Sequence, residues 1–256
     1  MKIIIITEKY GGFCNRLFQS LHYHAYSIEK NIKFFNPTML GILKFDNYFF
    51  YFLDNINNFL LRSITKVFRI IFGRKELYFY FNRNNYIKFV NGWDFRKYKL
   101  SAKHHKVLKS LYSFDKRYFS GKSIKLLKFL INKKKDGKFI IGIHIRRRDY
   151  KQWNKGIYYF DDDFYKDVIN KLKKNLINEN KDPFVVVVSD EKIISDIGAN
   201  FYSEGSWKQD QITLQSCDLI VGPPSTFTMW ASYISQVPLI KLNENKNFTN
   251  AIVCRG

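Results

Sequence analysis

A continuous run of mostly β-branched residues at 139–145 (FIIGIHI) limits the fold of this 256-residue chain more than any other feature. Apolar and polar residues do not alternate in it, so the strand that it predicts is covered on both faces. The run stops abruptly at Arg146, Arg147, Arg148 and Asp149. We therefore expect a buried strand of a parallel sheet that emerges directly into a cluster of charges.

Similar signals follow at regular intervals along the second half of the chain. Three more short apolar runs predict strands at Val185–Val188, Leu219–Val221 and Val237–Ile240. Helical stretches are expected at 162–176, which begins beside acidic residues 161–163 where a helix dipole favours anions, and at 227–234. This alternation of strand and helix predicts a parallel, doubly wound α/β sheet.

The chain also begins with an α/β pattern. A β-branched strand is expected at 1–7, a glycine turn at Gly11 and Gly12, and a helix over 15–30, where apolar residues recur at helical spacing. Residues 31–100 contain few boundary signals. A polar, turn-prone stretch at Lys133–Gly137 is the candidate domain boundary, so we predict an N-terminal domain at 1–135 and a C-terminal domain at 136–256.

The net charge of +21 is confined almost entirely to the first half of the chain. Residues 1–135 contain 27 basic and 7 acidic residues, whereas residues 136–256 contain 16 and 15. Such asymmetry indicates an anionic partner, either nucleic acid, membrane lipid, an acidic glycan or a phosphorylated ligand. The alternative is that the excess charge only solvates the protein. With 46% apolar and 18% aromatic residues, the composition excludes intrinsic disorder.

Two basic amphipathic segments bear on where the protein is located. Arg62, Lys66 and Arg69 share one helix face, and residues 122–135 combine apolar residues with lysines. Such helices lie on anionic membrane surfaces or simply expose their cations to water. No apolar stretch is long enough to span a membrane, and the first strand is too short for a signal peptide. We expect a cytoplasmic protein that is either free or bound peripherally at the inner face of the membrane.

The three cysteines do not form a metal-binding or disulfide pattern. Cys14, Cys217 and Cys254 are odd in number and have neither CxxC nor Cys/His spacing. This absence fits a reduced compartment, and no metal site is expected.

Polar residues follow each predicted strand of the second half at the point where it ends. They are His144, Arg146, Arg147 and Asp149, then Ser189 and Asp190, then Ser225 and Thr226. Because ligands of parallel sheets bind beyond the carboxyl ends of the strands, these groups are expected to share one crevice. Arginines bind diphosphates through paired donors, and hydroxyls at a helix start bind phosphate. A nucleotide diphosphate derivative is the predicted ligand.

Each residue type also has a purely structural interpretation. Ser225 and Thr226 serve equally well as helix caps. Asp190 either forms part of a turn or accepts hydrogen bonds from a nucleobase or ribose. A single His144 at a strand end is commonly structural, and adjacent arginines are often merely solvated. The joint placement of these groups at three strand ends favours the shared site.

Three motifs resemble those of a known enzyme family. His144–Tyr150 (HIRRRDY) resembles the His-x-Arg-Arg-x-Asp signature of α1,2-, α1,6- and protein O-fucosyltransferases, and its form with tyrosine is most similar to bacterial α1,2-fucosyltransferases of glycosyltransferase family 11. Residues 11–19 (GGFCNRLFQ) resemble that family's N-terminal glycine turn. Residues 224–232 (PSTFTMWAS) resemble its serine-rich segment and the aromatic helix after it.

The resemblance implies an inverting, metal-independent transferase that takes a GDP-sugar as donor and needs no cofactor. It implies two Rossmann-like domains in a B-type glycosyltransferase fold, with the donor site in the C-terminal domain. Arg146 is then the catalytic residue at the donor β-phosphate, which fits the chemistry because departure of GDP builds negative charge on the diphosphate. The implied substrate-binding residues are Gly12, Asn15, His144, Arg147, Asp149, Asp190, Ser225, Thr226 and Phe227.

Departures from the family pattern leave the substrate open. Cys14 replaces a turn glycine, Arg16 replaces a glutamine, and Arg148 replaces a small residue of the arginine motif. The donor is therefore GDP-fucose or another GDP-linked deoxy sugar such as a 6-deoxyheptose, and the acceptor is expected to be a surface glycan. A transferase that has lost turnover is a further alternative, as is a non-catalytic protein that binds nucleic acid or acidic glycans. For an active enzyme no nucleic-acid partner is expected.

The general base is not fixed by the sequence. Glu8, Asp46 and Asp94 are candidates, and a dissociative mechanism without a base is also compatible with the motifs.

Overall fold

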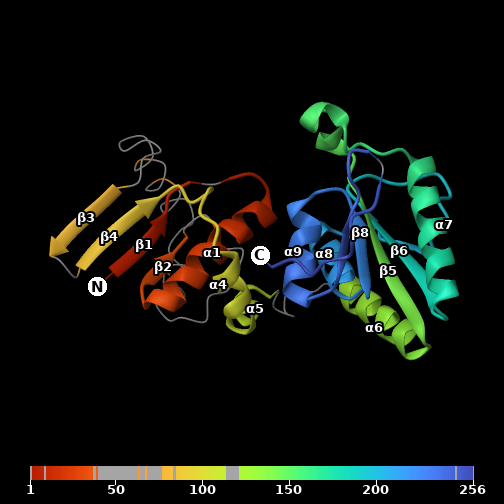
Figure 1. Ribbon diagram of the computed structural model, residues 1–256, viewed down its shortest axis with the longest axis horizontal. Coiled ribbons are helices and arrows are strands. Elements are labelled where there is room, and N and C mark those ends of the chain that lie inside the picture. Colours follow the sequence, from red (N-terminus) through yellow and green to blue (C-terminus); the bar gives the residue numbers. More distant parts are fainter. Residues whose placement is uncertain are drawn as a thin grey trace. The chain divides into compact units, whose positions relative to one another are not determined.

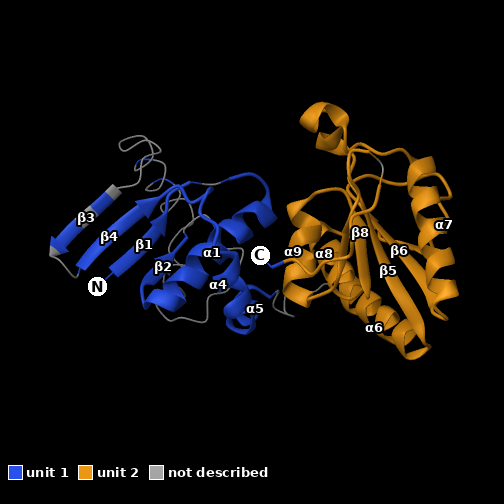
Figure 2. Cartoon of the chain, in the orientation of Figure 1, with its two compact units in different colours: residues 1–115, 255–256 blue, residues 116–254 orange. Residues whose placement is uncertain are grey.

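The computed structural model describes residues 2–8, 10–36, 39, 63, 67, 77–82, 85–113, 121–245 and 247–255. The chain divides into two compact units (Figures 1 and 2). Unit 1 comprises residues 1–115 and 255–256, and unit 2 comprises residues 116–254. Each unit is built on its own β-sheet.

Unit 2 contains the parallel sheet that the sequence predicted. Its strands are β5 (Lys138–Ile145), β6 (Asp182–Ser189), β7 (Phe201–Tyr202), β8 (Leu219–Gly222) and β9 (Leu239–Lys241). They pair in the order β7-β6-β5-β8-β9, and all pairs are parallel. The order reverses between β5 and β8, which is the switch point of a doubly wound sheet.

Helices cover both faces of this sheet (Figure 1). They are α6 (Gly121–Lys135), α7 (Asp162–Asn178), α8 (Trp207–Gln215) and α9 (Thr226–Ser235). Alternate residues of β5 face opposite layers, as the pleat of a strand requires. Ile141 and Ile143 pack with Val168 of α7, whereas Ile140 packs with Leu126 of α6. Both faces are thus apolar, which explains why the strand sequence does not alternate.

Unit 1 contains a smaller mixed sheet. Its strands are β1 (Lys2–Ile6), β2 (Lys33–Phe35), β3 (Leu77–Asn82) and β4 (Asn85–Val90). They pair in the order β2-β1-β4-β3, and β3 is antiparallel to β4. The predicted strand–turn–helix opening is present, with α1 (Phe13–Lys30) packed on Ile4, Ile6 and Val90 through Tyr23. Two shorter helices follow, α4 (Tyr98–Lys103) and α5 (His105–Tyr112).

The break between the two units lies at residues 115–116 rather than at the predicted boundary of 135–136. Helix α6 accounts for the difference. The sequence analysis assigned it to the N-terminal domain because the turn after it is polar. Its buried residues Leu126 and Leu130 instead pack with Ile140 of β5 and Val186 of β6, so α6 is part of unit 2.

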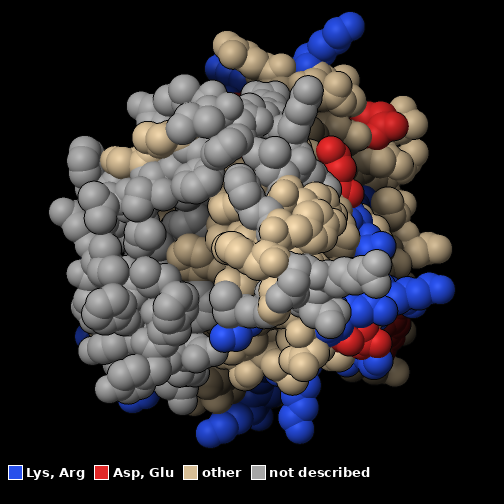
Figure 3. Space-filling model, turned by 90° about the vertical axis from the view of Figure 1, so that its left-hand side faces the viewer, with Lys and Arg blue, Asp and Glu red and all other residues tan. Residues whose placement is uncertain are grey.

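The basic surface is described only in part. Arg62, Lys66 and Arg69 lie outside the described residues. On the face in Figure 3, described Lys and Arg side chains project at the upper, right-hand and lower margins, and Asp and Glu side chains gather in few places. Among the described residues, none of the helices combines the length and the hydropathy needed to cross a membrane.

Candidate active site

The candidate site of unit 2 lies at the carboxyl ends of β5, β6 and β8. Arg146 follows β5, Asp190 follows β6, and Ser225 follows β8 by three residues. Since these strands are adjacent and parallel, their ends form one edge of the sheet, on both sides of the switch point. The fold therefore brings together the polar groups that the sequence analysis singled out at these strand ends.

Arg146 is the partly exposed cation at this edge, with about a third of its side chain accessible. Its Nη2 lies 2.6 Å from Asp149 Oδ1, and its Nη1 lies 3.0 Å from Asp190 Oδ2. The guanidinium carbon is also 5.7 Å from the centre of the Tyr150 ring. Two carboxylates and one ring thus fix the guanidinium while part of it stays open to a ligand.

Arg147 points to the opposite face of the sheet and is buried. Its guanidinium donates to the main-chain oxygen of Phe160 and to Asp162 Oδ1, and it lies 5.1 Å from the centre of the Tyr159 ring. Its main-chain N–H donates to Asp190 Oδ1 at 2.8 Å. Arg147 therefore ties the end of β5 to α7 and to β6, which makes it a positioning residue in this structure.

His144 is buried on the same face of β5 as Arg146. Its ring lies 5.0 Å from that of Phe227, and its Nδ1 has no hydrogen-bond partner among the described residues. Burial, together with the nearby Arg146, lowers the pKa of His144 to about 3, so the imidazole is neutral at physiological pH. Gly222 allows this packing, because a Cβ there would lie 3.0 Å from the main-chain oxygen of His144.

The loop after β8 leads into the N-terminus of α9. Ser225 is the N-cap and accepts a hydrogen bond from the N–H of Phe227 at 3.1 Å, so the predicted capping role is present. Ser225, Thr226 and Phe227 are all partly exposed. Tyr150 donates its hydroxyl hydrogen to the main-chain oxygen of Pro224, which connects the arginine motif to this loop. The free N–H groups of a helix N-terminus favour an anion at this position.

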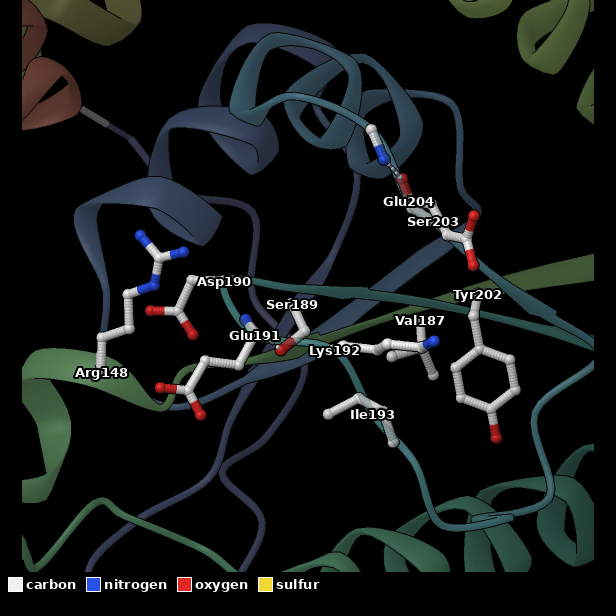
Figure 4. Close-up of a pocket in the computed structure, with 11 residues that line it drawn as sticks. Arg148, Val187, Ser189, Asp190, Glu191, Lys192, Ile193, Tyr202, Ser203 and Glu204 are labelled. Carbon is white, nitrogen blue, oxygen red and sulfur yellow. Dashed lines mark hydrogen bonds between the residues drawn. The ribbon is translucent and has the colours of Figure 1, made fainter.

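A pocket of about 430 Å³ adjoins the site on its β6 and β7 side (Figure 4). Arg148 and Asp190 lie at one end of it, and Tyr202 and Glu204 at the other. Its remaining lining is Val187, Ser189, Glu191, Lys192, Ile193, Ser203 and Gly205. The volume falls in the range of small-molecule sites, and the lining is rich in hydrogen-bonding groups.

A buried carboxyl lies behind one wall of this pocket. The hydroxyl of Ser203 donates to Oδ1 of Asp210 in α8 at 2.7 Å. Burial raises the pKa of Asp210 to about 7, although the hydrogen bond from Ser203 acts in the other direction.

The predicted residues of the glycine turn belong to unit 1. Gly12 is the N-cap of α1, and Asn15 lies in the first turn, packed against Gly11, where a Cβ would lie 2.1 Å from Asn15 Nδ2. Of the candidate bases, Glu8 is buried and accepts a hydrogen bond from Tyr10 at 3.4 Å, whereas Asp94 is exposed. Asp46 lies outside the described residues.

Two participants were not identified from the sequence as site residues. Asp162 was expected only to interact favourably with the helix dipole, but it also binds Arg147. Tyr150 connects the arginine motif to the loop after β8. Tyr150 belongs to the motif itself, so its position was a usable signal. The pairing of Arg147 with Asp162 depends on how α7 packs on the sheet, which sequence spacing does not reveal. No cluster of potential metal ligands occurs within the described part of the chain.

A family model agrees with the motifs in the second half of the chain. The model of the family Glycosyl transferase family 11 matches residues 75–252. No curated protein sequence matches this chain. Among solved structures, fucosyltransferase NodZ from Bradyrhizobium is 12% identical, with a TM-score of 0.53 over 97% of this chain and 99% of NodZ. A mutant of Arabidopsis thaliana FUT1 in complex with GDP is 13% identical, with a TM-score of 0.48 over 94% of this chain and 70% of FUT1.

The likeness to NodZ shows a shared α/β fold, as predicted. The family match covers well over half of the chain and includes the arginine motif, the pocket and the helix α9. The match includes two of the three motifs, and the glycine turn at 11–19 lies outside it. The family resemblance is thereby confirmed, and the protein belongs to glycosyltransferase family 11.

Proposed function

We propose that this glycosyltransferase transfers L-fucose from GDP-fucose to a hydroxyl group of a glycan, with inversion at the anomeric carbon and without a metal ion. The observation that carries the proposal is the position of Arg146. It is a fixed, partly exposed guanidinium at the switch point of the sheet, next to a strand end that leads into the N-terminus of α9.

This geometry suits departure of a diphosphate. Breaking the bond between the anomeric carbon and the phosphate oxygen leaves positive charge on the sugar and negative charge on GDP. Arg146 would bind the β-phosphate, and the N–H groups at the start of α9 would bind the neighbouring phosphate oxygens. Asp149 and Asp190 hold the guanidinium in place before the reaction, so little reorganisation is needed when the charge develops.

The pocket beside Asp190 would receive the nucleoside. In doubly wound sheets a carboxylate at the end of the second strand accepts hydrogen bonds from the ribose. Here Asp190 already accepts from the Arg147 N–H, so we assign it mainly to positioning the arginines. The carboxylates of Glu191 and Glu204 in the same pocket would accept hydrogen bonds from the N–H groups of guanine.

The proposal also covers the acceptor, the base and the membrane. We place acceptor contacts in unit 1, near Gly12 and Asn15 at the start of α1, because the family motif of the glycine turn lies there. Glu8 and Asp94 stay candidate bases beside a dissociative mechanism without a base. The basic segment around Lys66 would hold the enzyme at the cytoplasmic face of a membrane.

Calorimetry with GDP and GDP-fucose in EDTA tests the donor site. We expect micromolar binding by the wild type, loss of detectable binding in Arg146→Ala, and intermediate binding in Arg146→Lys, which keeps the charge but not the paired donors. Lys151→Ala, an exposed cation five residues away, is the matched control and should bind normally. Unchanged binding in a folded Arg146→Ala protein would contradict the role of Arg146, and binding only with added Mg²⁺ would contradict metal independence.

Turnover assays address the sugar and the alternative of a lost activity. GDP release is measured with a panel of glycan acceptors and with GDP-fucose or a GDP-6-deoxyheptose as donor. Release above the rate of hydrolysis with GDP-fucose supports the proposal. GDP release only with the GDP-6-deoxyheptose would change the proposed donor sugar but leave the proposed donor site intact. Donor binding without any GDP release would indicate a transferase that has lost turnover.

A further inference from the structure

The segment between the arginine motif and α7 presents aromatic side chains that the proposed donor chemistry does not use. It contains two short 3-10 turns, Arg148–Lys151 and Trp153–Gly156, and projects from unit 2 beyond the end of the sheet (Figure 1). Trp153 is 45% exposed, which is unusual for so large an apolar side chain.

These rings form a continuous row that begins at the donor site. Arg146 lies 5.7 Å from the centre of the Tyr150 ring, whose centre lies 4.8 Å from that of Trp153. Trp153 in turn stacks on Tyr158 with the ring centres 5.5 Å apart and the planes 29° apart. Only the Tyr150 ring therefore separates the proposed phosphate ligand from the exposed indole.

The backbone holds Trp153 in this position at a conformational cost. Asn154, Lys155 and Gly156 all have left-handed φ angles, at 48°, 59° and 76°. Non-glycine residues adopt this conformation rarely, and each costs roughly 1 kcal/mol or more. The reversal makes the chain double back, so that Tyr158 lies against the Trp153 ring.

A carboxylate completes the surface. The hydroxyl of Tyr158 donates to Glu244 Oε2 at 3.1 Å, and Glu244 itself is exposed on the loop after β9. Flat aromatic rings next to an exposed carboxylate match the two faces of a pyranose, which offers C–H groups to a ring and hydroxyl donors to an oxygen anion. The nucleoside pocket includes none of the three rings.

We propose that Tyr150, Trp153, Tyr158 and Glu244 form a carbohydrate-binding subsite for the acceptor glycan beside the donor diphosphate, in addition to the acceptor contacts proposed for unit 1. The inference rests on the proposed glycosyl transfer. It assigns Trp153 as the stacking platform, Tyr158 and Glu244 as the polar partners, and Tyr150 as the link that keeps the row aligned with Arg146.

Acceptor kinetics on Trp153 variants test the subsite. We expect Trp153→Ala to raise the KM for the acceptor about tenfold, since a stacked ring contributes roughly one tenfold step in affinity. Trp153→Phe should retain most of the acceptor affinity, because it keeps a flat ring. The Kd for GDP-fucose and the slow hydrolysis without acceptor should be unchanged in both variants. Trp207→Ala is the matched control, since Trp207 is a similarly exposed tryptophan at the start of α8.

Direct binding separates a failure of the subsite from a failure of the proposed function. Saturation-transfer NMR, at saturating GDP, uses oligosaccharides ending in galactose, glucose or N-acetylglucosamine and requires no turnover. Signals that are present in the wild type and in Trp207→Ala but lost in Trp153→Ala support the subsite, even if GDP-fucose is not the donor.

Three results would overturn the subsite. They are binding of no oligosaccharide by the wild type, the same binding in Trp153→Ala as in the wild type, and a parallel loss of GDP affinity in Trp153→Ala. The last result would mean that the aromatic row only supports Arg146.

Discussion

Different kinds of side chain lie at the carboxyl ends of the central strands in the two units. In unit 2 the arginines after β5 are matched by carboxylates, since Arg146 pairs with Asp149 and Asp190, and Arg147 with Asp162. In unit 1 the ends of β1 and β4 are joined by an uncharged amide. The Gln19 side chain donates to the main-chain oxygens of Glu8 and Asn91.

The contrast indicates different tasks for the two edges. Ion pairs at the edge of unit 2 fix a positive charge in advance, which suits an anion whose charge increases during the reaction. At the edge of unit 1 the Gln19 amide joins the two strand ends, which suits a neutral, hydroxyl-rich ligand better. Substitutions at the two edges should therefore have different consequences.

The largest effect is expected at Arg147. Arg147→Ala leaves the carbonyl of Phe160 and the carboxylate of Asp162 without their donor in a largely buried setting, so unit 2 should lose about 3 kcal/mol of stability. Urea unfolding, with hydrogen exchange to assign the loss to unit 2, is the measurement. Arg146→Ala serves as the comparison, because it should abolish GDP binding at little cost in stability. Equal stability losses in both variants would refute the division between a positioning and a catalytic arginine.

A second effect concerns the pH dependence of unit 2. Burial raises the pKa of Asp210 from 3.8 to about 7, so its contribution to stability is complete below pH 3.8 and is lost as the pH rises to about 7. Burial lowers the pKa of His144 from 6.5 to about 3, so its contribution is complete above pH 6.5 and is lost as the pH falls towards 3. The two effects oppose each other across this interval.

Asp210→Asn removes the first of these effects and should make the protein more sensitive to acid. Its stability should rise with pH between about 4 and 6.5 by a few kcal/mol more than that of the wild type. Urea midpoints across this range provide the measurement. Parallel pH profiles for the two proteins would show that Asp210 does not titrate as its burial indicates.

Gln19→Ala should have a smaller effect, limited to unit 1. The substitution leaves two main-chain oxygens without their side-chain donor and should cost about 2 kcal/mol. Gln152→Ala, an exposed glutamine of unit 2, is the control and should be neutral. Hydrogen exchange should show faster opening of β1 and β4. A loss of GDP binding without destabilisation would contradict this prediction, because it would show that Gln19 acts in donor binding rather than in the stability of unit 1.

The smallest effect is expected at the basic segment around residue 66. If it binds an anionic membrane, Lys66→Gln should weaken co-sedimentation with anionic vesicles about fivefold, since one cation near such a surface contributes about 1 kcal/mol. The effect should disappear at high salt. Equal partitioning of the wild type to neutral and anionic vesicles would reject membrane attachment.

The sequence predicted unit 2 far better than unit 1. Continuous apolar runs such as Phe139–Ile145 favour strands covered on both faces, and α7 shows the expected helical spacing. In unit 1 the antiparallel strand β3 was not predicted. Its pairing with β4 depends on contacts between strands, and neither segment has a decisive local pattern.

The sequence by itself determined the parallel α/β fold of unit 2, the family and the residues gathered at the strand ends. These follow from periodicity and from short motifs, which are local properties of the chain. Only the tertiary structure decided what each residue does. Just after β5, Arg146 pairs with Asp149 and Asp190 at the open edge, whereas Arg147 binds Asp162 at the start of α7. The packing of α6 on β5 moves the break between the units to residues 115–116. Such roles depend on neighbours that are distant in sequence, so spacing alone does not fix them.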